Sequence, residues 1–300
     1  MKVLVIGGGG REHAICWKLS KSPKVDELYC APGNAGIAEV AKCVDIGVMD
    51  FEKMADFAKK EAFDLVVVGP DDPLAGGIVD VLEEKGLRVF GPRKNAAILE
   101  GSKAFSKDLM KKYNIPTAAY ETFTDPHKAL EYLQTAKMPI VLKADGLATW
   151  KGVLICNTLE EAEAGVKEIM EDKKFGSAGN QMVIEEFMTG REVSVLSFVD
   201  GDTIRIMTSS QDHKRAFDGN QGPNTGGMGV YSQCPQLHAR GGPAAVWRRS
   251  SCPRWPPQGG GPPLPGSALL WPDAHPRRPQ GGGVQCPLRR SRMPGGALPA

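Results

Sequence analysis

Short apolar runs and amphipathic stretches alternate along the first third of the chain. Runs of strand length lie at Val3–Ile6, Leu28–Ala31, Leu65–Val68 and Arg88–Phe90, and each interval between them is long enough for a helix. Short apolar runs are typical of buried strands, and strands that alternate with helices form parallel sheets. The pattern therefore predicts an α/β domain with a doubly wound parallel sheet over residues 1–100.

Glycine-rich turns follow three of these runs, at Gly7–Gly10, Ala31–Gly36 and Gly69–Leu74. Ligands bind at the carboxyl ends of parallel strands, where glycine lets the backbone come close and the N-terminus of a helix favours an anion. The turns therefore predict a phosphate or substrate site, with purely structural turns as the alternative. The dinucleotide-binding fingerprint fails, because Glu12 stands where GxGxxG requires its third glycine.

A second pattern begins near Gly101 with a lysine-rich helix. Two apolar strands follow it, Ile140–Asp145 and Met182–Phe187. Lysines on a helix usually form a solvated face, whereas a lysine inside an apolar strand is costly to bury without an anion. Lys143 is therefore a stronger phosphate candidate than Lys103. For the second strand, an ordinary edge hairpin with a solvated acidic face is the alternative.

The run Gln211–Tyr231 reads QDHKRAFDGNQGPNTGGMGVY and is interpreted as one loop. Its segment Pro223–Gly229 offers clustered backbone amides without bulky side chains, which suits a phosphate or an acyl phosphate. A structural glycine loop does not need the charged residues that precede this segment. His213 is not predicted to be a catalytic base, because acyl-phosphate chemistry depends more on positioning and charge neutralisation.

The composition changes abruptly after Ser232. Of 23 prolines, 14 lie beyond this residue, and of 35 acidic residues only Asp273 does. The last 68 residues contain nine Arg but no Lys, Ile, Phe or Tyr, so they lack much of the β-branched and aromatic mass that a core buries. We expect residues 233–300 to be unstructured, either as a natural Pro/Gly/Arg-rich tail or as the product of a lost reading frame.

Charge and cysteine usage exclude several classes of function. The formal charge is about −6 up to Ser232 and about +8 beyond it, so the overall +2 describes neither part and does not indicate nucleic-acid binding. The start of the chain has neither a secretory signal nor a membrane span, which predicts a cytoplasmic protein without a membrane partner. The seven cysteines show no CxxC spacing and are expected to be reduced thiols. Neither they nor the five dispersed histidines indicate a zinc site.

Five motifs carry a resemblance to a known family: GGGGREHA, APGNAG, GPxxPL, QDHKR and PNTGGMG, in this order. Together they resemble glycinamide ribonucleotide synthetase, a phosphoribosylamine–glycine ligase family of the ATP-grasp superfamily. The resemblance holds in frame over residues 1–232. It implies an N-terminal substrate-binding α/β domain (1–100), a partial, incomplete ATP-grasp domain of the α+β class (101–232), and an aberrant tail (233–300).

The implied reaction joins glycine to 5-phosphoribosylamine and gives glycinamide ribonucleotide, ADP and phosphate through a glycyl phosphate. ATP is used with Mg²⁺, or Mn²⁺. The sequence gives no prediction about protein partners. The resemblance assigns substrate contacts to Gly8, Gly9, Gly10, Arg11, Asn34, Asp71, Pro223, Asn224, Thr225, Gly226, Gly227, Met228 and Gly229. It assigns ATP contacts to Lys103, Lys143, Lys151, Gly152, Glu185, Glu186, Phe187 and Glu192. It assigns catalytic roles to Asp212, Lys214 and Arg215.

The chain departs from the family pattern at several of its positions. Asp71 stands where glutamate is usual, Trp150 replaces a glycine of the flap over the triphosphate, and Asn220 stands where aspartate is common. The family takes its metal ligands from the glutamate and asparagine of a V-E-F-N strand. Those places hold Gly283 and Gln285 here, so we expect the metal ligands to be missing and this chain to be impaired.

The genetic code permits an explanation for these departures in the tail. Codons available to residues 278–294, read one nucleotide downstream, permit GPKVVEFNARFGDPECQ, and residues 269–276 permit YSGLMLTP. Both strings resemble the family, which supports the lost reading frame. Two other functions remain open: a noncatalytic nucleotide- or phosphate-binding fragment, and a related ATP-grasp ligase that acts on another purine intermediate.

Overall fold

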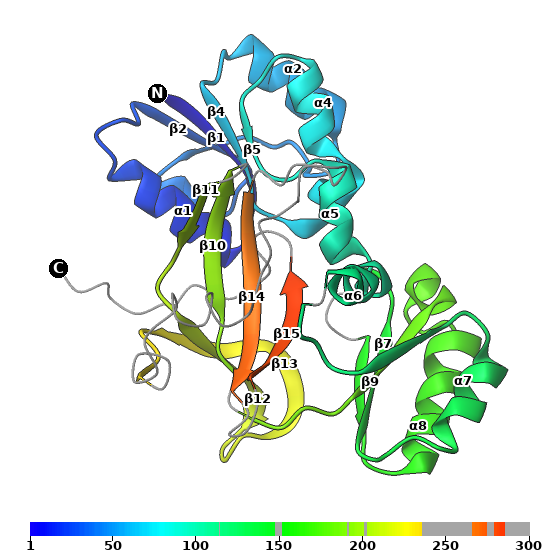
Figure 1. The fold of residues 1–300 in the computed structure, drawn as a ribbon. Coiled ribbons are helices and arrows are strands. Elements are labelled where there is room, and N and C mark those ends of the chain that lie inside the picture. The colour runs from blue at the N-terminus through cyan, green and yellow to red at the C-terminus, as the bar shows by residue number, and fades with distance from the viewer. Residues whose placement is uncertain are drawn as a thin grey trace.

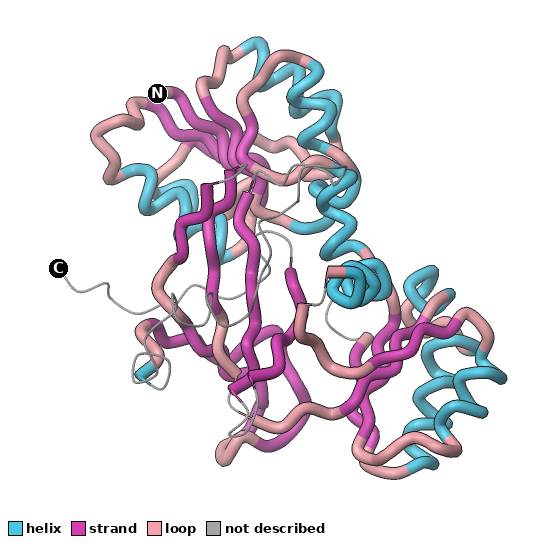
Figure 2. Tube along the Cα trace, in the orientation of Figure 1, coloured by secondary structure: helices cyan, strands magenta, loops and turns pink. Residues whose placement is uncertain are grey.

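The computed structural model describes residues 1–113, 115–147, 152–190, 192–200, 203–235, 266–274 and 279–285. Figure 1 shows an N-terminal α/β domain, a small second lobe, and long antiparallel strands that run down from the first domain beside the lobe. Figure 2 shows that the helices gather in the N-terminal domain and in the small lobe. No helix in the described part of the chain is long and apolar enough to cross a membrane.

The N-terminal domain is a five-stranded parallel sheet in the order β3-β2-β1-β4-β5. Its strands are β1 (Lys2–Gly7), β2 (Glu27–Pro32), β3 (Lys42–Cys43), β4 (Leu65–Val68) and β5 (Val89–Phe90). Its helices are α1 (Gly10–Ser20), η1 (Ile37–Glu39), α2 (Phe51–Lys60), α3 (Asp71–Gly76), α4 (Ile78–Glu84) and α5 (Lys94–Gly101). The predicted doubly wound domain and its four strands are confirmed, whereas the short edge strand β3 carries no apolar run.

The two sides of β1 show why helices are needed on both faces of the sheet. Val3 and Val5 pack in one buried cluster with Cys16 of α1, while Leu4 and Ile6 pack in another with residues of α2 and α4. Successive side chains of a strand point to opposite faces, so an uninterrupted apolar run predicts a strand that is covered on both sides.

Glu12 organises the turns at the carboxyl ends of β1 and β4. Its Oε2 accepts a hydrogen bond from the backbone N–H of Gly9 (2.7 Å), and Arg11 Nε donates to its Oε1 (3.1 Å). A Cβ atom added at Gly7 would lie 2.4 Å from Glu12 Cγ, and one added at Gly69 would lie 2.3 Å from Oε1. These glycines are therefore required by a buried carboxylate of the protein itself, which sequence reasoning did not identify.

The small lobe contains a four-stranded antiparallel sheet in the order β6-β9-β7-β8. Its strands are β6 (Tyr120–Phe123), β7 (Ile140–Ala144), β8 (Val153–Cys156) and β9 (Met182–Glu186). Its helices are α6 (Lys103–Lys112), α7 (Pro126–Leu133) and α8 (Leu159–Val166), followed by the π turn η2 (Lys167–Glu171) and the 3₁₀ turn η3 (Gly176–Asn180). Figure 1 shows α7 and α8 against one face of this sheet, with α6 on the other side.

A second antiparallel sheet has the order β11-β10-β14-β15. Its strands are β10 (Val195–Asp200), β11 (Thr203–Ile206), β14 (Gly266–Ala274) and β15 (Pro279–Gln285). β14 and β15 lie in the region that the sequence predicts to be unstructured, and for these two segments the structure corrects that prediction. Antiparallel pairing uses backbone N–H and C=O groups, and every residue except proline has both. β14 can therefore pair with the edge of β10, and β15 with β14, although their composition is poor in the residues that favour a core. The rest of residues 236–300 lies outside the described residues.

The run interpreted from sequence as one loop is instead a β-hairpin, which corrects that prediction. β12 (Ser210–Phe217) and β13 (Gln221–Ser232) pair with each other, with register shifts on both sides of Arg215. Gly219 has a positive φ in the turn between the strands, and Gly222 and Gly227 have positive φ within β13, where the register shifts. A cluster of glycines therefore marked irregular strands here, not the absence of strands.

Substitutions in the first turn test the packing role of Glu12. We expect Gly7→Ala to destabilise the protein by about 1–3 kcal/mol, because the new methyl group overlaps Glu12 and Gly7 has a φ of +132°. Gly10→Ala is the matched control, since its methyl group meets no atom of the described residues within 4 Å. It should stay within about 1 kcal/mol of the wild type in urea unfolding. Equal effects of the two substitutions would contradict this account.

Candidate functional site

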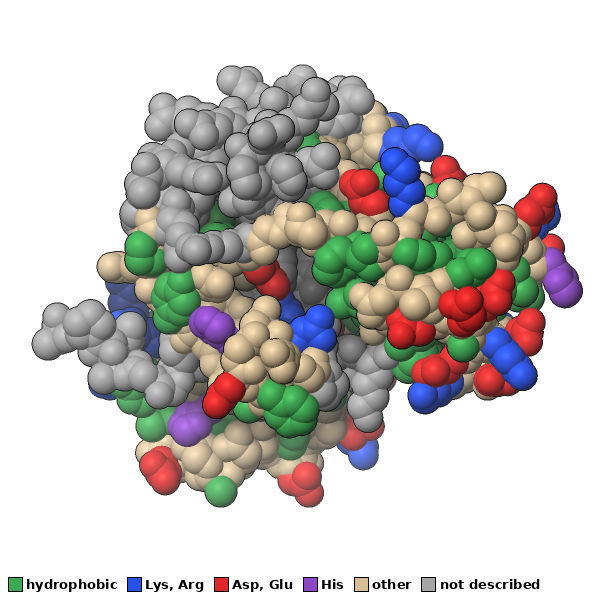
Figure 3. All heavy atoms as spheres, turned by 90° about the horizontal axis from the view of Figure 1, so that it is seen from below, with side chains coloured by type: hydrophobic (Ala, Val, Ile, Leu, Met, Phe, Trp, Pro, Cys, Tyr) green, Lys and Arg blue, Asp and Glu red, His purple; other side chains and the backbone are tan. Residues whose placement is uncertain are grey.

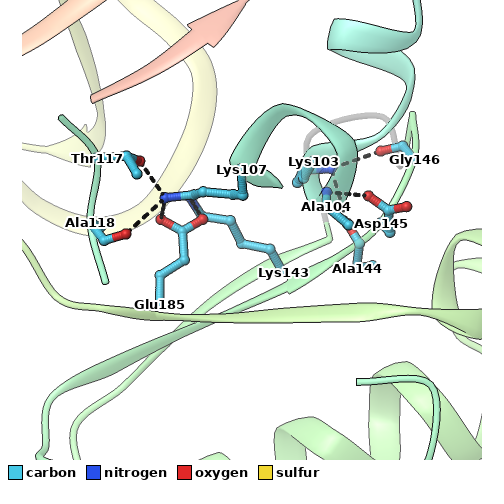
Figure 4. Close-up of polar contacts among 10 residues, drawn as sticks. All are labelled: Lys103, Ala104, Lys107, Thr117, Ala118, Lys143, Ala144, Asp145, Gly146 and Glu185. Carbon is cyan, nitrogen blue, oxygen red and sulfur yellow. Dashed lines mark hydrogen bonds and ion pairs between the residues drawn. The ribbon is translucent and has the colours of Figure 1, made fainter. Parts of the chain in front are cut away.

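Two lysines share one buried carboxylate in the small lobe. Lys107 Nζ lies 2.9 Å from Glu185 Oε2, and Lys143 Nζ lies 2.6 Å from Glu185 Oε1. The side chains of Lys107 and Glu185 are 7% and 5% exposed, whereas that of Lys143 is 27% exposed. Figure 4 shows the three groups converging from α6, β7 and β9. This cluster is called the lysine–glutamate triad below.

Strand alternation places the triad on one face of the sheet. Val141 pairs with Glu185, and Lys143 pairs with Val183, so the two charged residues are diagonal neighbours on the same side. Leu142 and Ile184 point to the opposite side, where they pack in the buried cluster with α7 and α8. The charged face is thereby turned towards α6, which supplies Lys107.

The charges of the triad alter its titration. Burial alone would raise the pKa of Glu185, but the ammonium groups of Lys143 and Lys107 outweigh it and lower that pKa below its usual value. Burial lowers the pKa of Lys107, and the carboxylate of Glu185 opposes this effect. Two cations on one anion leave the triad with an excess of positive charge, and Lys143 is its most accessible member.

A second set of contacts binds the start of α6 to the end of β7. The side chain of Asp145 accepts hydrogen bonds from Ala104 N (3.0 Å) and Ser102 Oγ (3.0 Å), and Ser102 Oγ also caps α6 by accepting from Phe105 N. Lys103 Nζ donates to the carbonyl oxygens of Ala144 (2.9 Å) and Gly146 (2.7 Å) (Figure 4). The predicted ATP residues Lys103 and Lys143 therefore both border the end of β7.

The predicted flap follows directly from this point. Trp150 and Lys151 lie outside the described residues. Gly152 is described, and its carbonyl oxygen accepts a hydrogen bond from Ala144 N (2.8 Å). At the other end of the site, Phe187 is 37% exposed beyond β9. Glu186 Oε1 accepts from the backbone N–H of Ala119 (3.1 Å).

Two of the predicted catalytic residues and the predicted ATP residue Glu192 meet at the hairpin. Lys214 forms an ion pair and hydrogen bond with Glu192, and its Nζ lies 3.4 Å from Asp212 Oδ2. Asp212 Oδ1 is buried, and no described residue donates a hydrogen bond to it. Arg215 turns away from these groups, because its Nη1 donates to the carbonyl oxygen of Gly222 (2.6 Å). The structure thus brings Glu192, Asp212 and Lys214 together without Arg215.

Described parts of the predicted substrate segment on β13 make contacts within the hairpin. Thr225 Oγ1 donates to the carbonyl oxygen of Lys214 (2.8 Å) and accepts from Gly227 N (3.0 Å). A Cβ atom at Gly227 would lie 2.9 Å from Asp212 Oδ1, whereas the side chain of Met228 is exposed. Gly229 pairs with His213 in the hairpin. Pro223, Asn224 and Gly226 lie in β13, but the structure does not describe the side chains of Pro223 and Asn224.

The predicted substrate residues of the N-terminal domain form one cluster at the carboxyl edge of its sheet. Arg11 Nη1 lies 3.9 Å from Asp71 Oδ1, and Asn34 Nδ2 donates to the carbonyl oxygen of Gly8 (2.9 Å). Arg11 is 10% exposed, and no described residue accepts a hydrogen bond from its Nη1. A buried guanidinium nitrogen in this position is suited to a ligand oxygen.

A recess opens between the lobe of α7 and α8 and the rest of the molecule. The space-filling view from below shows it with both basic and acidic side chains at its rim (Figure 3). The two expected metal-ligand positions, Gly283 and Gln285, lie in β15. Glycine has no side chain and glutamine has no charge, and the described residues contain no group of three or more His, Cys, Asp or Glu that could hold a metal ion. They therefore do not provide the carboxylate set that magnesium prefers.

Sequence reasoning missed the residues that position this site. Lys107, Asp145 and Ser102 each make a contact that fixes α6 against the sheet. Ser102 was detectable as a helix N-cap, since serine directly before a helical stretch is typical of that position. The partners of Lys107 and Asp145 are distant in sequence, so no local pattern indicated them.

Comparisons with known proteins agree for both domains. The family model described as phosphoribosylglycinamide synthetase, N domain, matches residues 1–100, and the model for its ATP-grasp (A) domain matches residues 101–241. A phosphoribosylamine–glycine ligase of Halalkalibacterium halodurans is 54% identical over 237 residues, which cover 79% of this chain and 55% of the relative. The ligase of Escherichia coli K12 is 51% identical over 253 residues, covering 82% of this chain and 59% of the relative. The chain thus spans little more than half the length of the curated relatives it matches.

The solved structures agree with these matches. The crystal structure of phosphoribosylamine–glycine ligase from Thermotoga maritima matches with a TM-score of 0.77 and 30% identity. The match covers 97% of this chain and 70% of that one.

Replacing Glu185 tests the charge balance of the triad. We expect Glu185→Gln to destabilise the protein by about 3–5 kcal/mol at pH 7, because the buried ammonium group of Lys107 and the partly exposed one of Lys143 lose their anion. The folded-state pKa of Glu185 is lowered, so its stabilising contribution is present above the unfolded pKa of about 4.3 and is lost as the pH falls through the lower folded value. The difference from the wild type should therefore shrink below about pH 4 in urea unfolding. Glu121→Gln, at an exposed position of neighbouring β6, should show no such convergence.

Proposed function

Because the chain belongs to the phosphoribosylglycinamide synthetase family, we propose that it carries the ATP-binding and substrate-binding parts of a ligase that joins glycine to 5-phosphoribosylamine in purine biosynthesis. The observation that carries this proposal is the surplus cation of the triad. Lys143 is accessible, and a second ammonium group already compensates its carboxylate. Such a site attracts a strong anion, and the triphosphate of ATP is the anion that the reaction requires.

The other contacts with ATP follow the course of the chain around the triad. Lys103, Lys151 and Gly152 are assigned to the triphosphate. The backbone of Glu185, Glu186 and Phe187 meets the edge of the adenine. Glu192 accepts hydrogen bonds from the ribose, and its ion pair with Lys214 links the nucleotide to the hairpin.

The substrates are assigned to the two remaining clusters. Arg11, with Asn34, Asp71 and the amides of Gly8–Gly10, binds 5-phosphoribosylamine, and the buried Nη1 of Arg11, from which no described residue accepts a hydrogen bond, supports an oxygen contact. Asp212 and Lys214, with the amides of residues 223–229, hold the glycine carboxylate and the acyl phosphate. The buried Oδ1 of Asp212 is a suitable acceptor for a substrate amine.

The chemistry divides into two steps. A glycine carboxylate oxygen attacks the γ-phosphorus of ATP, and the bond to ADP breaks. The amine of 5-phosphoribosylamine then attacks the carbonyl carbon of the glycyl phosphate, loses a proton, and expels phosphate. The ammonium group of Lys214 lies beside Asp212, where it neutralises the growing negative charge.

A noncatalytic ATP-binding fragment is the second candidate function. It is favoured by one observation, the glycine and glutamine at the two expected metal-ligand positions in β15. Such a fragment would bind ATP and form no product.

Calorimetry with MgATP tests the binding part of the proposal. We expect the wild type to bind ATP and Lys143→Met to bind it about 10–100-fold more weakly, because a charged hydrogen bond to phosphate is lost. Lys128→Met removes an exposed lysine on α7 and should leave the affinity unchanged. Unchanged affinity in Lys143→Met would refute the assignment of the phosphate site.

Turnover separates the two candidate functions. If the chain is a competent ligase, ADP release should require both glycine and 5-phosphoribosylamine, and mass spectrometry should detect glycinamide ribonucleotide. ATP binding without glycine-dependent ADP release favours the fragment. Turnover when bicarbonate replaces glycine would instead indicate a ligase for another purine intermediate.

A further inference from the structure

The two lysines of the triad differ in how firmly the surrounding structure holds them. Lys107 Nζ contacts Glu185 Oε2 (2.9 Å), Thr117 Oγ1 (2.8 Å) and the carbonyl oxygen of Ala118 (3.5 Å). It also lies 5.5 Å from the centre of the Tyr120 ring. Its ammonium group is therefore enclosed by partners from the following loop and from β6 and β9.

Lys143 has a different environment. Among the described residues, Glu185 is the one ion-pair partner of Lys143, and about a quarter of the lysine side chain is exposed. Lys143 can therefore leave its partner towards solvent, whereas Lys107 cannot leave without emptying a buried position.

Two other carboxylates near the triad, those of Glu186 and Asp108, have hydrogen-bond partners of their own. The carboxylate of Glu186 accepts a hydrogen bond from the backbone N–H of Ala119. The carboxylate of Asp108 accepts a hydrogen bond from the side-chain hydroxyl of Tyr120. Both carboxylates already have a partner outside the triad. Within the part of the chain that the structure describes, Glu185 is thus the one carboxylate that both lysines contact.

We propose that Lys107 is the permanent counter-ion of Glu185 and that Lys143 is an exchangeable one, which moves from Glu185 to a phosphate oxygen when the nucleotide binds. Lys107 is then a positioning residue for ATP binding, although it does not touch the nucleotide. This inference rests on the proposed ATP-binding function.

Electrostatics requires such a second cation. Removing one partner of a buried ion pair is strongly unfavourable, because it leaves an uncompensated charge in the interior. If Lys143 were the only cation on Glu185, every binding event would have to break the pair and strand the carboxylate. With Lys107 in place, the carboxylate keeps a cation throughout, and the movement of Lys143 costs little.

The test compares MgATP affinity by calorimetry in the wild type, Lys107→Met, and the double variant Lys107→Met/Glu185→Gln. Lys107→Met should weaken binding about 10–100-fold, because Lys143 becomes the sole counter-ion of Glu185 and is retained there. Neutralising the carboxylate in the double variant should release Lys143 and recover a large part of that loss. A merely structural role for Lys107 predicts no such recovery. Wild-type affinity in Lys107→Met, or no recovery in the double variant, would overturn the proposal.

A nucleotide-free measurement keeps the inference separate from the proposed function. In thermal unfolding without ATP, Lys107→Met should lower the midpoint by about 6–12 °C, since the fully buried pair is broken. Lys143→Met leaves that pair intact and should lower it by less than about 4 °C. If the wild type binds no ATP, the proposed function fails, and these midpoints still decide the ranking of the two lysines. A drop for Lys143→Met as large as that for Lys107→Met would sink the assignment of Lys107 as the permanent counter-ion.

Discussion

The buried negative charge of Glu185 constrains the whole arrangement of the small lobe. A carboxylate in the interior of a sheet must have a cation, and the sheet alone supplies only Lys143 at the margin of the solvent. The second cation comes from α6, which ties that helix to β9. The proposed anion site is thus a consequence of how the lobe compensates one charge.

Protein carboxylates also occupy the helix N-termini that an anion would otherwise use. Glu12 accepts from the first turn of α1, and Asp145 accepts from the first turn of α6. A phosphate bound near either helix therefore finds one amide already engaged, that of Gly9 or that of Ala104, and side-chain cations supplement the remaining amides. Arg11 in the first domain and Lys103 and Lys143 in the second stand beside these capped ends. The glycines at Gly7 and Gly69 make room for Glu12, so a glycine-rich turn here reflects internal packing as well as any ligand.

The sequence predicted the elements whose pattern is local and missed the contacts that depend on distant partners. The four apolar runs of the first domain and the strands carrying Lys143 and Glu185 were identified correctly, because alternation and burial can be recognised within a few residues. The hairpin at residues 210–232 was misinterpreted as a loop, since its glycines and register shifts hide the period of a strand. Lys107 resembled a solvated helical lysine, and only the antiparallel register of β7 and β9 shows that a carboxylate faces it.

The proposed function assigns nucleotide binding and phosphoryl transfer to different stretches of this chain. The residues proposed to bind ATP lie between Lys103 and Glu192, and they include Lys143 and Glu185, whose charges compensate each other. The positions expected to hold a metal lie in β15, which is joined to the fold through backbone pairing with β14. Backbone pairing tolerates almost any side chain, whereas metal binding requires particular carboxylates. A change of side chains in the last strands can therefore remove metal ligands while the strands still pair, and none of the residues proposed to bind ATP lies in those strands.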